Sequence, residues 1–130
     1  QELTQEIRVV CEYENWVSIV PFFARFPYEI HLVPRTNHAN LNAMEEATLD
    51  GLAEGIKDVT SRLDRLFGFS MPYIMAMYQY GGDSSRFSLE FYPPYRTKDK
   101  LKYLAGSEFA CGAFIVDALP EKTAAQLRSL

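Results

Sequence analysis

A single long hydrophobic stripe between residues 45 and 67 limits the folds that are open to this chain. Apolar side chains recur there at alternating intervals of three and four residues, namely Leu49, Leu52, Ile56, Val59, Leu63 and Leu66. This spacing puts them on one face of an α-helix. Asn42, with Glu45 three residues later, predicts an N-cap, and Gly68 fits a C-terminal cap. The stripe indicates a helix that packs across a sheet rather than a coiled-coil seam, because strand patterns surround it.

Strand patterns lie on both sides of this helix, at residues 7–13, 16–20, 28–33, 73–80 and 86–92. In the last of them Phe87, Leu89 and Phe91 alternate with polar residues. Pro93 and Pro94 end that strand, because proline cannot donate to a sheet ladder. Shorter helices are predicted at 107–114 and 120–130. The predicted fold class is α+β, a single domain over residues 1–130: an antiparallel sheet packed by one long helix, plus a short C-terminal helix.

The composition argues against several classes of function. The net charge is -4 and the isoelectric point about 5.2, which argues against a surface that neutralises nucleic-acid phosphates. No apolar run reaches the roughly 18 residues of a membrane helix. We expect Cys11 and Cys111 to be buried free thiols in the reducing cytosol. No Cys-x-x-Cys pair occurs, so a zinc knuckle is not predicted.

Few residue patterns in the chain suggest chemistry. His31 and His38 are its two histidines, and His31, inside a strand pattern, is expected to be an ordinary core or surface histidine. Glu90 shares a predicted strand face with Arg86 and Ser88, where either a plain salt bridge or a binding role is expected. The helix carboxylates are expected to form a solvated face: Asp50, Glu54 and Asp58.

A second polar group follows the double proline. Lys102 and Glu108 flank Tyr103, Gly106 and Ser107. A cation, a carboxylate and an aromatic ring close together are suited to a sugar or a nucleotide, because they can meet phosphate, hydroxyls and a flat face respectively.

Several stretches together resemble the C-terminal half of galactose-1-phosphate uridylyltransferases. They are residues 20–29 (VPFFARFPYE), 34–35 (PR), 64–67 (DRLF) with 72–73 (PY), 91–96 (FYPPYR) and 102–108 (KYLAGSE). They occur in family order over nearly the whole chain. The resemblance implies a histidine-triad-like fold and a role in galactose metabolism. Family enzymes move a uridylyl group between glucose-1-phosphate and galactose-1-phosphate through a covalent uridylylated histidine.

The same resemblance implies that the reactive groups are missing here. The family nucleophile lies in a His-Pro-His motif of the N-terminal half, and this sequence has no such motif, so we expect no catalytic residue in it. The family's zinc or iron is held by histidines at positions that the resemblance assigns to Tyr78, Arg86 and Ser88. Arginine and serine are poor ligands for these metals, so we expect no metal cofactor.

The resemblance also implies sugar-nucleotide contacts, in the family often across a dimer interface, at Lys102, Tyr103, Ala105, Ser107 and Glu108. Phe114 stands where the family has a glutamine. The expected partners are weakly bound UDP-glucose or hexose-1-phosphate, and a missing N-terminal catalytic half or a homodimer partner. Neither nucleic acid nor membrane is expected as a partner.

Two alternatives stay open. In the first, the chain is a non-catalytic interaction or dimerisation module that uses the substituted face at Tyr78, Arg86 and Ser88. In the second, the metal ligands of the family were altered deliberately while the core pattern was kept.

Overall fold

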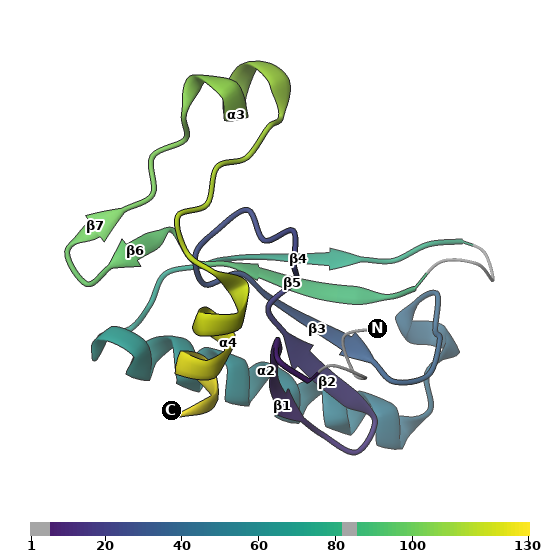
Figure 1. The fold of residues 1–130 in the computed structure, drawn as a ribbon. Coiled ribbons are helices and arrows are strands. Elements are labelled where there is room, and N and C mark those ends of the chain that lie inside the picture. Colours follow the sequence, from purple (N-terminus) through teal and green to yellow (C-terminus); the bar gives the residue numbers. More distant parts are fainter. Residues whose placement is uncertain (1–5, 82–85) are drawn as a thin grey trace.

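The chain forms a five-stranded antiparallel sheet with its two longer helices on one face (Figure 1). The computed structural model describes residues 6–81 and 86–130. The sheet order is β1-β2-β3-β5-β4, so β5 returns to pair with β3 and leaves β4 at the edge. The strand bounds are β1 Val9–Glu12, β2 Trp16–Ile19, β3 Ile30–Pro34, β4 Ile74–Tyr78 and β5 Ser88–Tyr92.

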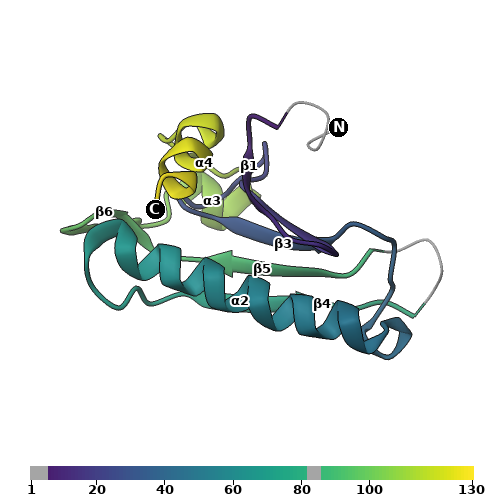
Figure 2. The same ribbon diagram turned by 90° about the horizontal axis from the view of Figure 1, so that it is seen from below.

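Helix α2 (Glu46–Phe67) runs along one face of this sheet, and α4 (Pro120–Arg128) lies against β1 and α2 (Figure 2). A short 3-10 helix, η1 (Leu41–Ala43), precedes α2. The predicted α+β architecture, with one long helix and a short C-terminal helix, is therefore confirmed. None of the helices in the described residues has the length and apolar character to cross a membrane.

The observed ends of α2 agree with the predicted caps only at the C-terminus. Gly68 has φ 75° and ends the helix in the left-handed region, as predicted. The predicted N-cap is wrong: Asn42 lies within η1, and Glu45 occupies the N-cap position without a side-chain hydrogen bond. Leu52, Val59 and Leu63 of the stripe are buried.

The helix approaches the sheet most closely at Gly55. A Cβ atom at this position would lie 2.8 Å from Leu32 Cδ2 and 2.9 Å from Leu32 Cδ1, nearer than carbon atoms can pack. Gly55 is therefore a packing requirement of this crossing.

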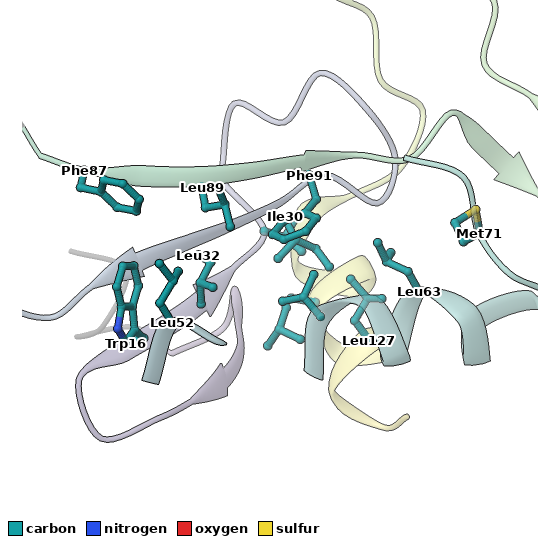
Figure 3. Close-up of a cluster of buried hydrophobic side chains, with 14 of the residues drawn as sticks. Trp16, Ile30, Leu32, Leu52, Leu63, Met71, Phe87, Leu89, Phe91 and Leu127 are labelled. Carbon is teal, nitrogen blue, oxygen red and sulfur yellow. The ribbon is translucent and has the colours of Figure 1, made fainter. Parts of the chain in front are cut away.

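The core lies between the sheet and the two helices (Figure 3). Phe87, Leu89 and Phe91 all point into it, which confirms the alternation predicted for this stretch. Trp16 is fully buried, packs edge-on against Phe87 with ring centroids 5.7 Å apart, and donates Nε1–H to the carbonyl oxygen of Thr48 at 2.7 Å. This bond fixes the start of α2 over β2.

Residues 95–119, here called the projecting segment, extend from the side of the sheet that faces away from α2 (Figure 1). The segment holds a small hairpin of β6 (Tyr95–Thr97) and β7 (Lys100–Leu101), followed by α3 (Gly106–Cys111). No strand was predicted where the hairpin lies. Helix α3 is shorter than the predicted 107–114, because Gly112 at φ 64° ends it.

The cysteine prediction holds in one respect and fails in another. Cys11 and Cys111 are both unpaired, but Cys11 is half-buried and Cys111 is exposed, so neither is fully buried.

Candidate functional site

A cavity of about 150 Å³ lies within the projecting segment. It is lined by Arg96, Lys102, Tyr103, Ala105, Glu108, Ile115 and Asp117. Four of the five residues for which the sequence implied sugar-nucleotide contacts therefore surround one hollow: Lys102, Tyr103, Ala105 and Glu108. The structure brings this predicted group together from the loop between β7 and α3 and from α3 itself.

Lys102 is held inside this site rather than presented to solvent. Its side chain is 5% exposed, and Nζ lies 2.7 Å from Glu108 Oε1. The same ammonium donates to the carbonyl oxygen of Ile115 at 3.0 Å and to that of Arg25. The rings of Phe26 and Phe114 cover it at 5.2 and 5.6 Å from their centroids. Lys102 thus ties the projecting segment to the loop between β2 and β3.

Glu108 has no free oxygen either. Oε2 accepts the backbone N–H of Ala105 at 2.5 Å, and Oε1 accepts that of Ile115 at 3.1 Å in addition to Lys102. The hydrogen bond from Lys102 and those from the two backbone groups lower the pKa of the Glu108 carboxyl from 4.5 to about 2. The carboxylate therefore fastens the N-cap of α3 to the loop that follows this helix. Direct sugar contact by Lys102 and Glu108 stays a prediction.

The groups that the site does offer to a ligand are different. Tyr103 is 83% exposed and presents its ring at the rim. Arg96 and Asp117 pair with each other and keep about half of their side chains exposed. Ser107 Oγ is buried, with no hydrogen-bond partner in the described part of the chain. An aromatic face and a guanidinium are therefore the stacking and polar elements available here, whereas the buried Ser107 hydroxyl does not line the cavity.

A second polar group lies on the sheet face away from α2, where β3 pairs with β5. The register sets His31 directly opposite Glu90. His31 Nε2 lies 2.8 Å from Glu29 Oε1 and 3.4 Å from Glu90 Oε2. Arg25 reaches the same two carboxylates from the β2–β3 loop. We call Arg25, Glu29, His31, Glu90 and Tyr92 the sheet-face cluster.

Glu29 stays ionised although its side chain is fully buried. Burial raises the pKa of this carboxyl, but the hydrogen bonds from His31 and the Arg25 N–H, with the charges of both side chains, outweigh burial and lower the pKa. The backbone N–H groups of Arg25 and Phe26 both donate to Oε2, at 2.6 and 3.2 Å. Glu29 therefore shapes the loop as well as the cluster.

The positions that the resemblance assigned to lost metal ligands are only partly adjacent. Tyr78 of β4 pairs with Ser88 of β5, and Ser88 Oγ lies 3.2 Å from Glu90 Oε1. Arg86 precedes β5 and is exposed, so the structure does not extend the strand face to it. Two hydroxyl groups beside a carboxylate do not fit the three-histidine site that the family implies.

Sequence reasoning missed the sheet-face cluster and misjudged one helix residue. Glu29 and His31 are two residues apart in one strand pattern, as are Ser88 and Glu90, but the pairing of their strands was not readable. His31 is indeed a core histidine, 6% exposed, yet it is hydrogen-bonded to the buried Glu29 carboxylate within the sheet-face cluster. Asp58 is not simply solvated: it accepts from Tyr13 Oη at 2.6 Å and from Arg62 Nε at 2.7 Å.

Comparison with known proteins agrees with the fold and the sequence motifs. All 130 residues match the family model described as "Galactose-1-phosphate uridyl transferase, C-terminal domain". The galactose-1-phosphate uridylyltransferase of Thermotoga maritima is 38% identical over 129 residues, which are 95% of this chain and 41% of that protein. The chain thus spans about two fifths of the length of this relative.

Solved structures give the same result. A uridylyltransferase structure superposes with a TM-score of 0.89 at 33% identity, over 95% of this chain and 41% of the other. A Hit-like protein from Bartonella henselae superposes with a TM-score of 0.65 at 11% identity, over 98% of this chain and 91% of the other, which shows the histidine-triad-like fold alone. The chain therefore belongs to the galactose-1-phosphate uridylyltransferase family, as its C-terminal domain.

Proposed function

We propose that this domain contributes part of the sugar-nucleotide-binding surface of a uridylyl-transferring protein, and that the attacking histidine lies outside these 130 residues. The observation that carries the proposal is the cavity in the projecting segment, because four of the five expected contact positions line it. The sequence has two histidines and no His-Pro-His motif. His31 is buried between two carboxylates, where no substrate phosphate can reach it.

Different residues around the cavity bind different parts of the ligand. The exposed Tyr103 ring stacks on a flat uracil or sugar face. Arg96 leaves Asp117 and pairs with a phosphate, since a guanidinium can bind phosphate through two parallel hydrogen bonds. Lys102 and Glu108 do not contact the ligand directly. They fix the conformation of the loop that carries the ligand-binding groups.

The partner that completes the site is an N-terminal half or a second copy of this chain. Relatives of the family are more than twice as long as the matched region, which supports the first of these. The two unpaired thiols, one of them exposed, support a reducing compartment, the cytoplasm.

Titration of the chain with UDP-glucose, followed by calorimetry and backbone NMR, tests the proposal. We expect weak binding, with resonance shifts concentrated at Tyr103 and Arg96. Tyr103→Ala and Arg96→Gln should each weaken binding about tenfold, a loss typical of one stacked ring or one charged hydrogen bond. Arg35→Gln is the matched control, because Arg35 pairs with Glu12 at the other end of the sheet.

Transfer activity gives the second readout. Uridylyl transfer to galactose-1-phosphate should appear only when an N-terminal half from a relative is added. Absence of both UDP-glucose binding and rescued transfer would overturn the proposal. Transfer by the 130-residue chain alone would overturn the claim that the nucleophile lies elsewhere.

Exposed apolar side chains favour a second candidate function, a non-catalytic association module. Phe109, Ile115 and Leu119 of the projecting segment are 78%, 62% and 58% exposed. Association with a partner would remove these three side chains from water. A dimer by light scattering that Phe109→Ser dissociates, in a chain without affinity for UDP-glucose, would favour this reading over the first.

A further inference from the structure

The sheet-face cluster contains two oxygen atoms that are shared by the same pair of nitrogen groups. Glu29 Oε1 lies 2.8 Å from His31 Nε2 and 3.6 Å from Arg25 Nη2. Glu90 Oε2 lies 3.4 Å from His31 Nε2 and 3.3 Å from Arg25 Nη2. The imidazole and the guanidinium therefore approach this carboxylate pair together.

One side of this arrangement has the donor set of a metal centre. Within residues 6–81 and 86–130, Glu29, His31 and Glu90 form a group whose ligand atoms all lie within 4.8 Å of one another. Divalent transition ions bind imidazole nitrogen and carboxylate oxygen at about 2.0–2.2 Å, so ligands of one ion stand about 3–4 Å apart. The two His31–carboxylate distances fall close to this range. These residues belong to β3, its leading loop and β5, and none is a position where the family histidines were expected.

The other side of the arrangement is already filled by a cation. Arg25 Nη2 donates to Tyr92 Oη at 2.5 Å, and its guanidinium carbon lies 4.8 Å from the centroid of the Tyr92 ring. Tyr92 in turn donates to Glu90 Oε2. An ion bound to both shared oxygens would lie within a few ångströms of this guanidinium and would be repelled by it. The Arg25 charge balances one of the two carboxylates, as a bound ion would.

We propose that Arg25 takes the place of a metal ion in the sheet-face cluster, and that removing its guanidinium opens a site for a divalent transition ion at Glu29, His31 and Glu90. The protein thus holds a fixed organic cation beside the carboxylates of a latent three-ligand site. This differs from a simple loss of metal ligands, because the ligands for such an ion are present and only their occupant is different. The inference is independent of sugar-nucleotide binding.

The decisive variant is Arg25→Met, which keeps an apolar stem against Tyr92 and Phe114 but removes the charge. The probe is Co²⁺, whose visible absorption reports its coordination, with Zn²⁺ calorimetry as a second measurement. We expect Arg25→Met to bind Co²⁺ at least about tenfold more tightly than the unaltered chain, a difference of about 1.4 kcal/mol. Adding His31→Gln to Arg25→Met should abolish the gain, because one ligand is lost.

Arg35→Met is the matched control, because it also removes one charge from an Arg–Glu pair but lies outside the cluster. It should bind Co²⁺ as weakly as the unaltered chain, which excludes a general effect of net charge. Arg25→Gln serves as a second opening variant, and circular dichroism shows which variants are folded.

Two results would overturn the proposal. The first is tight Co²⁺ or Zn²⁺ binding by the unaltered chain that is lost in His31→Gln, because Arg25 would then not exclude the ion. The second is a folded Arg25→Met or Arg25→Gln chain with no gain in affinity. The titration of the unaltered chain does not depend on the folding of any variant.

Discussion

The substitution Gly55→Ala separates local helix preference from tertiary packing. Gly55 lies in the middle of α2, where alanine is favoured over glycine by about 1 kcal/mol in an isolated helix. Helix preference alone therefore predicts a more stable protein. The structure predicts the opposite, because the new Cβ would lie 2.8 and 2.9 Å from the two δ carbons of the fully buried Leu32.

The magnitude follows from these two opposing effects. Adding a methyl group to a closely packed core costs about 1–3 kcal/mol, because neighbours leave their preferred rotamers. After the gain in helix preference, we expect Gly55→Ala to lower the free energy of unfolding by about 1 kcal/mol. In a Leu32→Val background the δ carbons are gone, so the same substitution should raise the free energy of unfolding by about 1 kcal/mol.

Urea unfolding of the four chains in this double-mutant cycle measures the effect, with Trp16 fluorescence and circular dichroism as independent probes. Contacting residues typically show coupling energies of about 0.5–3 kcal/mol, and we expect about 2 kcal/mol here. Ala53→Gly is the control, because Ala53 is exposed on the same helix and should report helix preference alone. A stabilised Gly55→Ala chain, or a coupling energy near zero, would refute the close approach of α2 to β3.

Three further predictions concern ionisation and reactivity. The pKa of Glu108 is lowered from 4.5 to about 2 in the folded chain, so its contribution to stability is complete above about pH 4.5 and is lost as the pH falls towards 2. The difference in melting temperature between the unaltered chain and Glu108→Gln should therefore vanish towards pH 2, and a difference that does not change with pH would contradict the lowered pKa. Tyr13→Phe should lower the free energy of unfolding by about 1.5 kcal/mol, because a half-buried hydrogen bond to the Asp58 carboxylate is lost while Arg62 still pairs with it. It should also raise the pKa of Asp58, measurable by carbon NMR, and an unchanged pKa would argue against the bond. In the native chain, the exposed Cys111 should react with a thiol reagent faster than the half-buried Cys11. The substitution Cys111→Ser should remove the fast phase of this reaction. Equal rates for the two thiols would contradict their different exposure.

Most of the secondary structure was readable because periodicity is a local property. The stripe of α2 and the alternation of Phe87, Leu89 and Phe91 repeat at the intervals of a helix and a strand, so each predicts its own element. Pro94 and Gly68 marked ends for equally local reasons. The prediction of an N-cap at Asn42 was wrong because Asn42 lies within η1, which precedes α2. Whether a short helix forms before a longer one depends on how the chain packs at that point.

The sequence indicated which residues belong to the candidate site but not how their side chains are oriented. The motif around Lys102 and Glu108 identified the correct segment, but the direction of their charged groups depends on contacts up to 77 residues away in sequence. Nothing local indicates that the Arg25 carbonyl receives the Lys102 ammonium. Asp117 was not considered as a site residue, since its approach to Arg96 follows from the path of the projecting segment.

The amino-acid sequence alone determined the long helix, the five strands of the main sheet, the α+β class and the family, because these depend on residue spacing and on motifs along the chain. Only the tertiary structure decided which charges meet. It paired β3 with β5 and so put His31 against Glu90, brought Arg25 to both carboxylates, and turned Lys102 inward. The physical reason is that an ion pair depends on separation in space, and the folding of distant strands and loops sets that separation.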